Sequence, residues 1–357
     1  MTEQETYIYR CIELAKAGAG YAAPNPLVGA VLVYNGRIIG EGFHQVYGQA
    51  HAEVNCIHSV ADADKQFIAL SMLYVSLEPC AHYGKTPPCA DLIIQQQIPE
   101  VIIGCRDPFK EVDGKGIEKL RAAGISVTVG VLEEQCIVLN KRFFTFHTKH
   151  RPFVVLKWAQ TVNSKIAADA GERLLITNDY TNRLVHRWRS EEAAILVGTN
   201  TALLDNPSLD TRLWYGKSPM RLVIDMDLRL PSSLQLFNGR QTTIVFNTLK
   251  HSIPEQPVDV HQTKGLYYYQ LNEQESVVTQ IMQACYALHI QSVLVEGGAA
   301  LLQSFIDEAI WDEARIITNE QLQVPEGLDA PVLTHAATAG SEHVLQDRVD
   351  YFTHSEG

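Results

Sequence analysis

One histidine and two cysteines form a candidate metal site. The segment His51-Ala52-Glu53 is followed along the chain by Pro79-Cys80 and then by Pro88-Cys89. One imidazole and two thiolates are a ligand set that tetrahedral zinc accepts, and they leave its fourth position open for water, as a catalytic site requires. Zinc lowers the pKa of such a water towards neutrality and so provides hydroxide without a strong base. The residue types therefore predict zinc-dependent hydrolysis.

Glu53 has a clear role beside such a zinc without being a ligand. A carboxyl group there takes the proton from the water and delivers it to a ring nitrogen and a leaving amine, as in zinc deaminases. The usual deaminase signature has two residues between its cysteines, whereas eight separate Cys80 from Cys89. Cys80 is expected just after a strand and Cys89 at the start of a helix, where the helix dipole favours a thiolate. We interpret the set as a variant of that signature.

Two other interpretations of this set remain open. The histidine and the cysteines are separate core residues in the first, since free cysteine is usually buried. The second is a structural zinc, which needs a fourth protein ligand, and His82 could supply it. The order and spacing of the whole set favour the catalytic site.

Length and composition predict a folded two-domain protein of the cytoplasm. The chain has 357 residues, of which 46% are hydrophobic and 20% charged. No apolar run is long enough to span a bilayer, and the polar start MTEQETYIYR does not resemble a secretory signal. The formal charge of −12 opposes non-specific binding to nucleic acid. Seven cysteines, an odd number, fit reduced thiols better than a disulfide framework.

Strands and helices alternate along both halves, which predicts two α/β domains, at residues 1–148 and 149–357. A polar stretch at 147–152 marks the boundary, and Asn35-Gly36 predicts a tight hairpin. The tail after Leu333 shows no clear pattern and is expected to be partly mobile. The predicted helices are 6–18, one from residue 51, 91–97, 116–123, one through 143, 180–189, 277–288 and 299–309. The predicted strands are 30–33, 37–40, 72–77, 101–104, 125–129, 153–158, 194–197, 222–224, 243–246, 292–295 and 314–317.

A glycine pair, Gly297-Gly298, lies between a predicted strand and a predicted helix. Such a turn lets backbone N–H groups approach a phosphate at the helix N-terminus. No complete Gly-x-Gly-x-x-Gly follows a strand, so a Rossmann fingerprint is not predicted. A simple tight turn is the alternative.

Several segments together closely resemble one enzyme family. They are Pro24-Asn25-Pro26-Leu27-Val28-Gly29, His44 with His51-Ala52-Glu53, Cys80-Ala81-His82-Tyr83-Gly84-Lys85-Thr86-Pro87-Pro88-Cys89, and Asp107-Pro108 leading to Gly114-Lys115-Gly116. The family is the bifunctional diaminohydroxyphosphoribosylaminopyrimidine deaminase and 5-amino-6-(5-phosphoribosylamino)uracil reductase of riboflavin biosynthesis. The resemblance covers nearly the whole chain and is strongest to about residue 150. The long loop between the cysteines distinguishes this family from ordinary cytidine deaminases.

The resemblance implies a cytidine-deaminase-like α/β/α sandwich followed by a dihydrofolate-reductase-like α/β domain. In the first domain it implies zinc on His51, Cys80 and Cys89, with Glu53 as the catalytic proton carrier. Amide, imidazole and ammonium groups suit a pyrimidine ring and its ribosyl phosphate. By position, the substrate-binding residues are Asn25, His44, His82 and Lys85.

The second domain also carries family-like segments, including Leu156-Lys157-Trp158-Ala159 and Asp205-Asn206-Pro207-Ser208-Leu209. The resemblance places Lys157 beside the reacting sugar as a catalytic residue. Arginines suit phosphate because each offers a planar fork of donors. The implied substrate-binding residues are Arg173, Arg189, Leu209, Arg212 and Glu296. The implied NADPH-binding residues are Ala159, Leu175, Thr201, Asp205 and Gly298, the last within the loop 297–303.

The chain departs from the family at two places in this domain. Arg173-Leu174-Leu175 replaces the usual Ser-x-Trp, and Val162-Asn163-Ser164 replaces a common Leu-Asp-Gly turn. Loss of a hydroxyl and an indole alters how substrate or nicotinamide is held, and Arg173 is a candidate replacement for the serine as a phosphate contact. The departures leave a weak reductase open as an alternative.

The implied function has two steps. Zinc-dependent hydrolysis deaminates 2,5-diamino-6-(5-phosphoribosylamino)pyrimidin-4(3H)-one, and NADPH then reduces the ribosyl group to ribityl. The family also suggests a homo-oligomer. Two rivals are a nucleic-acid-editing deaminase, which needs a basic groove and stacking aromatics, and a zinc-stabilised regulatory protein with a degenerate reductase half. The charge of −12 argues against the first.

Overall fold

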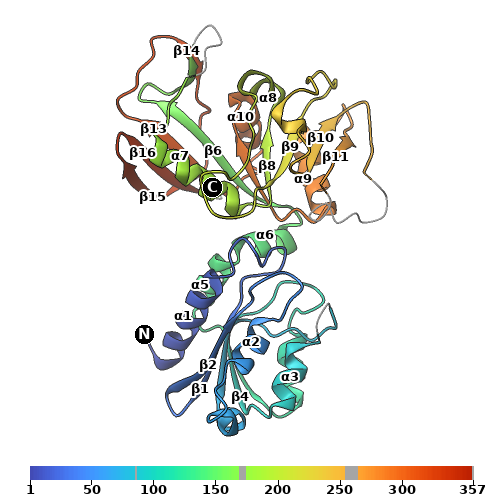
Figure 1. Ribbon diagram of the computed structural model, residues 1–357, viewed down its shortest axis with the longest axis vertical. Helices are drawn as coiled ribbons and strands as arrows, with labels where there is room; N and C mark the ends of the chain where they lie inside the picture. Colours follow the sequence, from blue (N-terminus) through green and yellow to red (C-terminus); the bar gives the residue numbers. More distant parts are fainter. Residues whose placement is uncertain (85–86, 169–173, 254–263, 356–357) are drawn as a thin grey trace. The chain divides into compact units, whose positions relative to one another are not determined.

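The chain forms two compact units, Met1–Lys149 and His150–Gly357. The computed structural model, drawn in Figure 1, describes residues 1–84, 87–168, 174–253 and 264–355. Lys85 and Arg173, both predicted to hold substrate, lie outside the described residues. Each unit is built around its own sheet.

The described part of the N-terminal unit contains a five-stranded sheet of order β2-β1-β3-β4-β5. Strand β1 pairs antiparallel with β2 and β3, whereas β3, β4 and β5 run parallel. Asn35 and Gly36 both have positive φ, 49° and 72°, as the predicted hairpin turn requires. The strands are β1 (Gly29–Tyr34), β2 (Arg37–Phe43), β3 (Met72–Leu77), β4 (Glu100–Cys105) and β5 (Ser126–Val129).

Helices cover both faces of this sheet, because successive strand residues point to opposite sides. Leu32 of β1 belongs to the core under α2 (Ala52–His58), α3 (Cys89–Gln95) and α4 (Lys115–Ala122). Its neighbour Val31 belongs to the core under α1 (Glu3–Lys16) and α5 (Glu133–Leu139). The predicted α/β/α sandwich is confirmed. A short 3-10 helix, η1 (Lys65–Leu70), precedes β3.

Phe143 lies in a helix as predicted, but the helical region is divided in two. Two helices, α5 and α6 (Lys141–Lys149), are separated at Asn140, whose φ of −111° ends the first. The Asn140 side chain bonds to the backbone of Leu27, 113 residues away.

The larger sheet of the C-terminal unit has, within the described residues, nine strands in the order β11-β10-β9-β8-β12-β6-β13-β16-β15. The first seven in this order are parallel, and β16 and β15 are antiparallel additions. The strands are β6 (Phe153–Thr161), β8 (Ala194–Val197), β9 (Met220–Ile224), β10 (Thr243–Asn247), β11 (Leu266–Gln270), β12 (Ser292–Glu296), β13 (Glu313–Asn319), β15 (Ala336–Val344) and β16 (Asp347–His354), while β7 (Lys165–Ala168) pairs with β14 (Gly327–Asp329).

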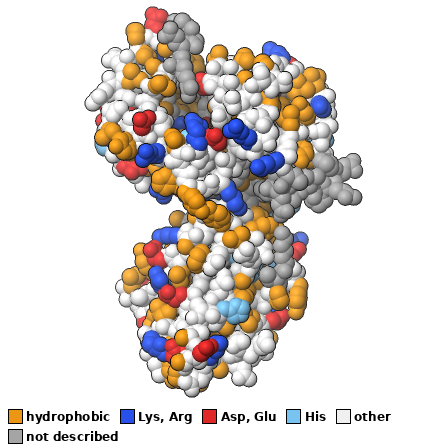
Figure 2. All heavy atoms as spheres, in the orientation of Figure 1, with side chains coloured by type: hydrophobic (Ala, Val, Ile, Leu, Met, Phe, Trp, Pro, Cys, Tyr) orange, Lys and Arg blue, Asp and Glu red, His pale blue; other side chains and the backbone are white. Residues whose placement is uncertain are grey.

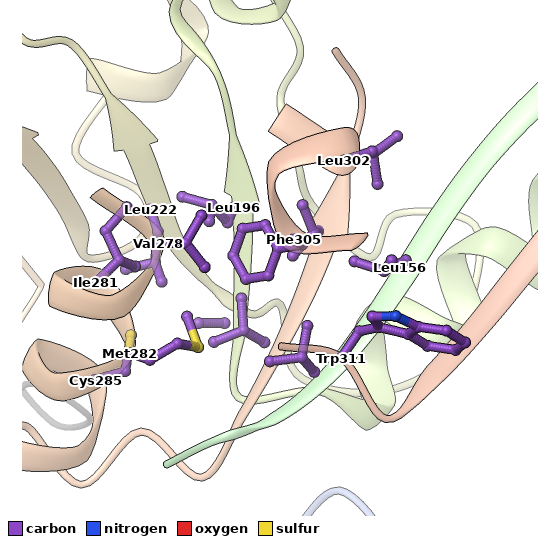
Figure 3. Packing of buried hydrophobic residues seen from close by; sticks show 14 of the residues in the cluster. Leu156, Leu196, Leu222, Val278, Ile281, Met282, Cys285, Leu302, Phe305 and Trp311 are labelled. Carbon is purple, nitrogen blue, oxygen red and sulfur yellow. The ribbon is translucent and has the colours of Figure 1, made fainter. Parts of the chain in front are cut away.

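The main core of this unit lies between the sheet and two helices (Figure 3). Helices α9 (Val277–Ala287) and α10 (Ala299–Asp307) contribute Ile281 and Phe305 to this core, where Phe305 lies beside Leu196 of β8. The opposite face packs against α8 (Thr199–Asp205), and a short 3-10 helix, η3 (Gln235–Phe237), adds to this layer. Helix α7 (Asp179–Glu191) packs Trp188 near β13 and β16.

The expectation of a partly mobile tail after Leu333 is wrong. Strands β15 and β16 continue the sheet beyond β13. The carboxylate Oδ2 of Asp347 accepts hydrogen bonds from the backbone N and the Nδ2 of Asn178, the N-cap residue of α7. Strands β15 and β16 are therefore part of the folded unit. In the described residues no helix is both long and apolar enough to cross a membrane.

Candidate active sites

The three predicted zinc ligands meet at one end of the N-terminal sheet. His51 is the N-cap residue of α2, Cys80 follows β3, and Cys89 is the first residue of α3. The Nδ1 atom of His51 lies 3.5 Å from Sγ of Cys80 and 3.4 Å from Sγ of Cys89. All three donor atoms lie within 4.8 Å of one another.

These distances suit a single tetrahedral zinc ion. Zinc bond lengths to nitrogen and sulfur imply about 3.6 Å between an imidazole nitrogen and a thiolate sulfur on one ion. Among the described residues the metal-binding group consists of His51, Cys80 and Cys89. His82, the candidate fourth ligand of a structural zinc, is not in that group. Three ligands and an open position are the arrangement of a catalytic zinc site.

One of the two thiols, that of Cys80, is set up to lose its proton. The hydrogen bond with Cys89 lowers the pKa of Cys80, and His51 adds to this effect. The same pairing, together with burial, raises the pKa of Cys89. The backbone N–H of Cys89 also donates to Sγ of Cys80 at 3.3 Å. A thiolate at Cys80 is the form that binds metal.

Glu53 lies in the first turn of α2 and is 3% exposed. Burial, reinforced by the neighbouring Cys80, raises the pKa of its carboxyl group to about 7. The carboxyl group also hydrogen-bonds to the Cys89 thiol. A carboxyl group that titrates near neutrality both accepts and returns a proton at physiological pH.

Two predicted substrate residues lie next to the ligand group. Nδ2 of Asn25 is 3.1 Å from Nε2 of His44, and the His44 ring stands edge-on to His51 with 5.3 Å between the ring centroids. Nδ1 of His44 is 3.1 Å from the carbonyl oxygen of Ala50. Burial lowers the pKa of His44, which favours the neutral ring.

His82 lies between the cysteines in sequence and beside Phe109 in space. The two ring centroids are 5.9 Å apart in an edge-on arrangement. Nε2 of His82 is 4.0 Å from a carboxylate oxygen of Glu111. His82 therefore has a defined set of neighbours within the described residues.

Two buried residues of this unit were not singled out from the sequence. The amide of Asn140 accepts from Leu27 N at 2.7 Å and donates to Leu27 O at 2.8 Å, which fixes the segment that carries Asn25. Its partner is too far along the chain for any local pattern to reveal. Glu78 is the other residue, and its only signal is an acidic group at the end of a buried strand, just before Cys80.

A buried ion cluster lies at the C-terminal end of β12 in the second unit. Lys157 of β6 and Glu296 of β12 are register partners. Glu296 accepts from Nε and Nη2 of Arg189 at 2.9 and 2.7 Å, and Nζ of Lys157 lies 3.9 Å away. The structure thus brings these three predicted residues together.

The charges of this cluster depend on one another. Burial alone would raise the pKa of Glu296, but Arg189 and Lys157 outweigh it and lower that pKa to about 2. Burial lowers the pKa of Lys157. In open parallel sheets, ligands bind at the carboxyl ends of the strands, and Glu296 is the last residue of β12.

A second feature of the unit is the glycine turn after β12. Gly297 and Gly298 have φ of +88° and +74°. A Cβ atom on Gly297 would lie 2.9 Å from Cγ2 of Thr201, so the turn and α8 approach closely. Helix α10 begins at Ala299 without a side-chain cap. Such a narrow, glycine-lined helix start suits the phosphates of a dinucleotide.

The other predicted residues of this unit lie outside the cluster of Lys157, Arg189 and Glu296. Leu209 is 3% exposed and its side chain lies in the core. Arg212 is exposed and pairs with Asp210 at 2.6 Å. Leu175 is 76% exposed, Ala159 packs beside Trp188 near β16, and Asp205 ends α8 at the surface. Figure 2 shows Lys and Arg side chains gathered on one face of this unit.

Comparison with known proteins agrees with this division. Residues 1–105 match the model of the cytidine and deoxycytidylate deaminase zinc-binding region, and residues 152–319 match that of the RibD C-terminal domain. A riboflavin biosynthesis protein RibD from Aquifex aeolicus is 38% identical over 314 residues, covering 86% of this chain and 84% of the relative.

Two solved structures extend the likeness to the whole chain. One is a diaminohydroxyphosphoribosylaminopyrimidine deaminase/5-amino-6-(5-phosphoribosylamino)uracil reductase from Thermotoga maritima, with a TM-score of 0.85, 37% identity and 98% coverage of both chains. The other is RibD from Acinetobacter baumannii, with a TM-score of 0.87, 29% identity and 99% coverage of both.

A zinc-type deaminase domain followed by a reductase domain defines the class of this protein. The chain belongs to the RibD family of riboflavin biosynthesis proteins. It is a bifunctional deaminase and reductase, with zinc and NADPH as its cofactors.

Proposed function

We propose that residues 1–148 deaminate 2,5-diamino-6-(5-phosphoribosylamino)pyrimidin-4(3H)-one and that residues 149–357 reduce the ribosyl group of the product to ribityl. The observation that carries the first part is the group of three donor atoms within 4.8 Å, with Glu53 buried beside it. The Thermotoga relative carries the names of both reactions.

In the deaminase unit, His51, Cys80 and Cys89 hold zinc, which supplies an activated water when bound. Glu53 accepts one proton of the attacking water and passes it to the ring nitrogen, and it then carries the second proton of that water to the amino group, which leaves as ammonia. Asn25 and His44, joined at 3.1 Å, contact the pyrimidine edge. His82 and Lys85 complete the substrate contacts.

In the reductase unit, NADPH supplies the hydride, and the chain supplies position and charge. Lys157 lies at the reacting sugar, and Glu296 keeps the ammonium and the Arg189 guanidinium in place. Thr201 and Gly298 cradle the cofactor, whose other contacts are Ala159, Leu175 and Asp205. The substrate phosphate is bound by Arg173 and Arg212, and by those donors of Arg189 that Glu296 does not use. Leu209 contributes through its backbone, since its side chain is in the core.

The alternative of a weak reductase rests on Arg173-Leu174-Leu175. A nicotinamide ring would lose an indole partner there, and Leu175 is 76% exposed. The complete cluster of Lys157, Glu296 and Arg189 favours an active second unit. A homo-oligomer in the cytoplasm that binds no nucleic acid completes the proposal, supported by the family and by the charge of −12.

Mass spectrometry of the products tests both activities. Purified protein receives the diaminopyrimidinone ribosyl phosphate with and without NADPH. The expected result is a product in which NH is replaced by O in both samples, followed by a gain of two hydrogens only with NADPH. Deamination that NADPH does not extend would support the weak reductase. Zinc-loaded protein that forms neither product would contradict the substrate assignment.

A further inference from the structure

The carboxylate of Glu78 accepts hydrogen bonds from one segment of backbone, residues 107–117. Glu78 follows β3, stands two residues before Cys80 and is 4% exposed. Both of its oxygens are used, and charge-assisted bonds of this kind are stronger than neutral ones. The donors are Asp107 N at 3.3 Å and Gly114 N at 3.0 Å to Oε2, and Gly116 N at 2.9 Å and Ile117 N at 3.3 Å to Oε1.

A second contact joins the same two parts of the chain. A Cβ atom on Gly116 would lie 1.9 Å from the carbonyl oxygen of Pro79. Only glycine allows the first turn of α4 to approach the backbone beside Cys80 this closely. The 107–117 segment is therefore fixed directly to the loop that carries a zinc ligand.

The segment in turn forms one side of the surroundings of His82. Phe109 lies edge-on to the His82 ring at 5.9 Å, and its backbone N–H is held by the Asp107 carboxylate at 2.8 Å. Glu111 lies 4.0 Å from Nε2 of His82. A displacement of the 107–117 segment would therefore also displace the groups that contact the His82 ring.

We propose that Glu78 is a positioning residue of the deaminase site. Its carboxylate sets the place of the 107–117 segment relative to Cys80, so that Phe109 and Glu111 hold His82 in its substrate-binding orientation. This inference rests on the proposed function, because that function assigns His82 to the substrate. Glu78 itself contacts neither zinc nor substrate in this scheme.

Glu78→Gln tests the proposal with little change in volume. Glutamine places an NH₂ group opposite two backbone N–H donors, so half of the acceptors are lost while every zinc ligand remains. We expect one zinc per chain, a rise of about tenfold in KM for deamination and a kcat within about threefold of wild type. Hydrogen exchange should accelerate in residues 107–117 of both the zinc-loaded and the metal-free protein.

Asp225→Asn is the matched control in the other unit. Asp225 is 2% exposed, and its carboxylate accepts the backbone N–H groups of Arg229 and Leu230 at 3.0 and 2.9 Å. The substitution Asp225→Asn removes the same kind of buried carboxylate acceptor but leaves the sequence of the deaminase unit unchanged. Its KM for deamination and its exchange in residues 107–117 should equal those of wild type.

Phe109→Leu tests separately whether Phe109 orients His82. It also keeps the proposal testable if Glu78→Gln does not fold. It removes the ring beside His82 but leaves the Glu78 bonds, so KM should rise while exchange in residues 107–117 stays slow. A wild-type KM in either variant, or a loss of zinc in Glu78→Gln, would overturn the inference. Failure of the wild-type protein to deaminate the substrate would instead overturn the proposed function.

Discussion

Each proposed site holds a buried carboxyl group whose charge state is set by its surroundings. Glu53 is poised near neutrality because burial opposes its charge. Glu296 stays ionised because Arg189 and Lys157 outweigh the same effect. A carboxylate that works as a proton carrier and one that works as a fixed anion are thus distinguished by their surroundings.

Glu53→Gln should remove deamination and leave zinc in place. The amide fills the same volume but cannot carry the proton, and general acid–base catalysis contributes about 10²–10⁴-fold. Deaminase kcat and zinc content measured on the same preparation check this. A variant with normal turnover would show that another group carries the proton. Reduction of separately supplied deaminated substrate should be unchanged.

His186 predicts a pH dependence of stability in the C-terminal unit. Burial, together with Arg189 and Arg212, lowers its pKa from the ordinary 6.5 to about 4. Between these two pH values the unfolded chain binds a proton that the folded chain does not. The free energy of unfolding should therefore fall as pH falls through this window, by at most about 1.4 kcal/mol per pH unit.

His186→Gln should flatten that dependence. All four tryptophans, at positions 158, 188, 214 and 311, lie in the C-terminal unit, so their fluorescence reports the unfolding of this unit. Urea titrations at pH 7, 5.5 and 4.5 give the comparison. His343→Gln, which replaces a histidine 61% exposed on β15, is the control. Equal pH slopes for wild type and His186→Gln would contradict the account.

At the scale of elements, the glycine turn between β12 and α10 links the sheet to the proposed cofactor site. Gly297→Ala adds a Cβ 2.9 Å from Thr201 at a φ of +88°. The affinity for NADPH should fall by about tenfold or more. Backbone strain at the positive φ and displacement of Thr201 by the new methyl group would both distort the proposed cofactor site. Deamination should be unchanged.

Gly239→Ala is the control for the backbone strain alone. Gly239 has a φ of +71°, and a Cβ there meets nothing within 4 Å. Titration of NADPH fluorescence with each variant measures the affinity. Equal NADPH binding by Gly297→Ala and Gly239→Ala would show that contact between the turn and Thr201 is not needed.

Elements with their own chemical signal were predictable from the sequence. Strand β3 has the predicted bounds, and Asn35-Gly36 makes the predicted turn. Strand β15 was not predictable, because most of its residues are exposed and it shows no apolar alternation. Its conformation depends on pairing with β16, which local propensity does not report.

The candidate sites divide in the same way. His51, Cys80 and Cys89 were predictable because few residue types bind zinc and their order is distinctive. The contacts of Glu78 and Asn140 were not, because their partners lie 29 to 39 and 113 residues away. Only the folded chain brings such partners together.

At the scale of the whole molecule, each unit contains its own sheet and its own core. The described strands and core clusters of Met1–Lys149 use residues of that unit alone. Residues 1–149 expressed separately should therefore fold, bind one zinc and deaminate, without reducing the product. Zinc analysis and the product assay check this, with Cys80→Ala in the same fragment as the zinc-free control. An unfolded fragment would show that the second unit is needed for the first.

The sheet order of the C-terminal unit has a consequence for synthesis on the ribosome. Strand β6 is the first strand of that unit to be synthesised, yet it pairs with β12 and β13, which are synthesised much later. The N-cap residue of α7 likewise needs Asp347, near the end of the chain, as its hydrogen-bond acceptor. The first 149 residues can close their sheet while translation continues. The reductase unit cannot complete its sheet until its last strands have been synthesised. Nascent chains that stall late in translation should therefore already contain an active deaminase unit.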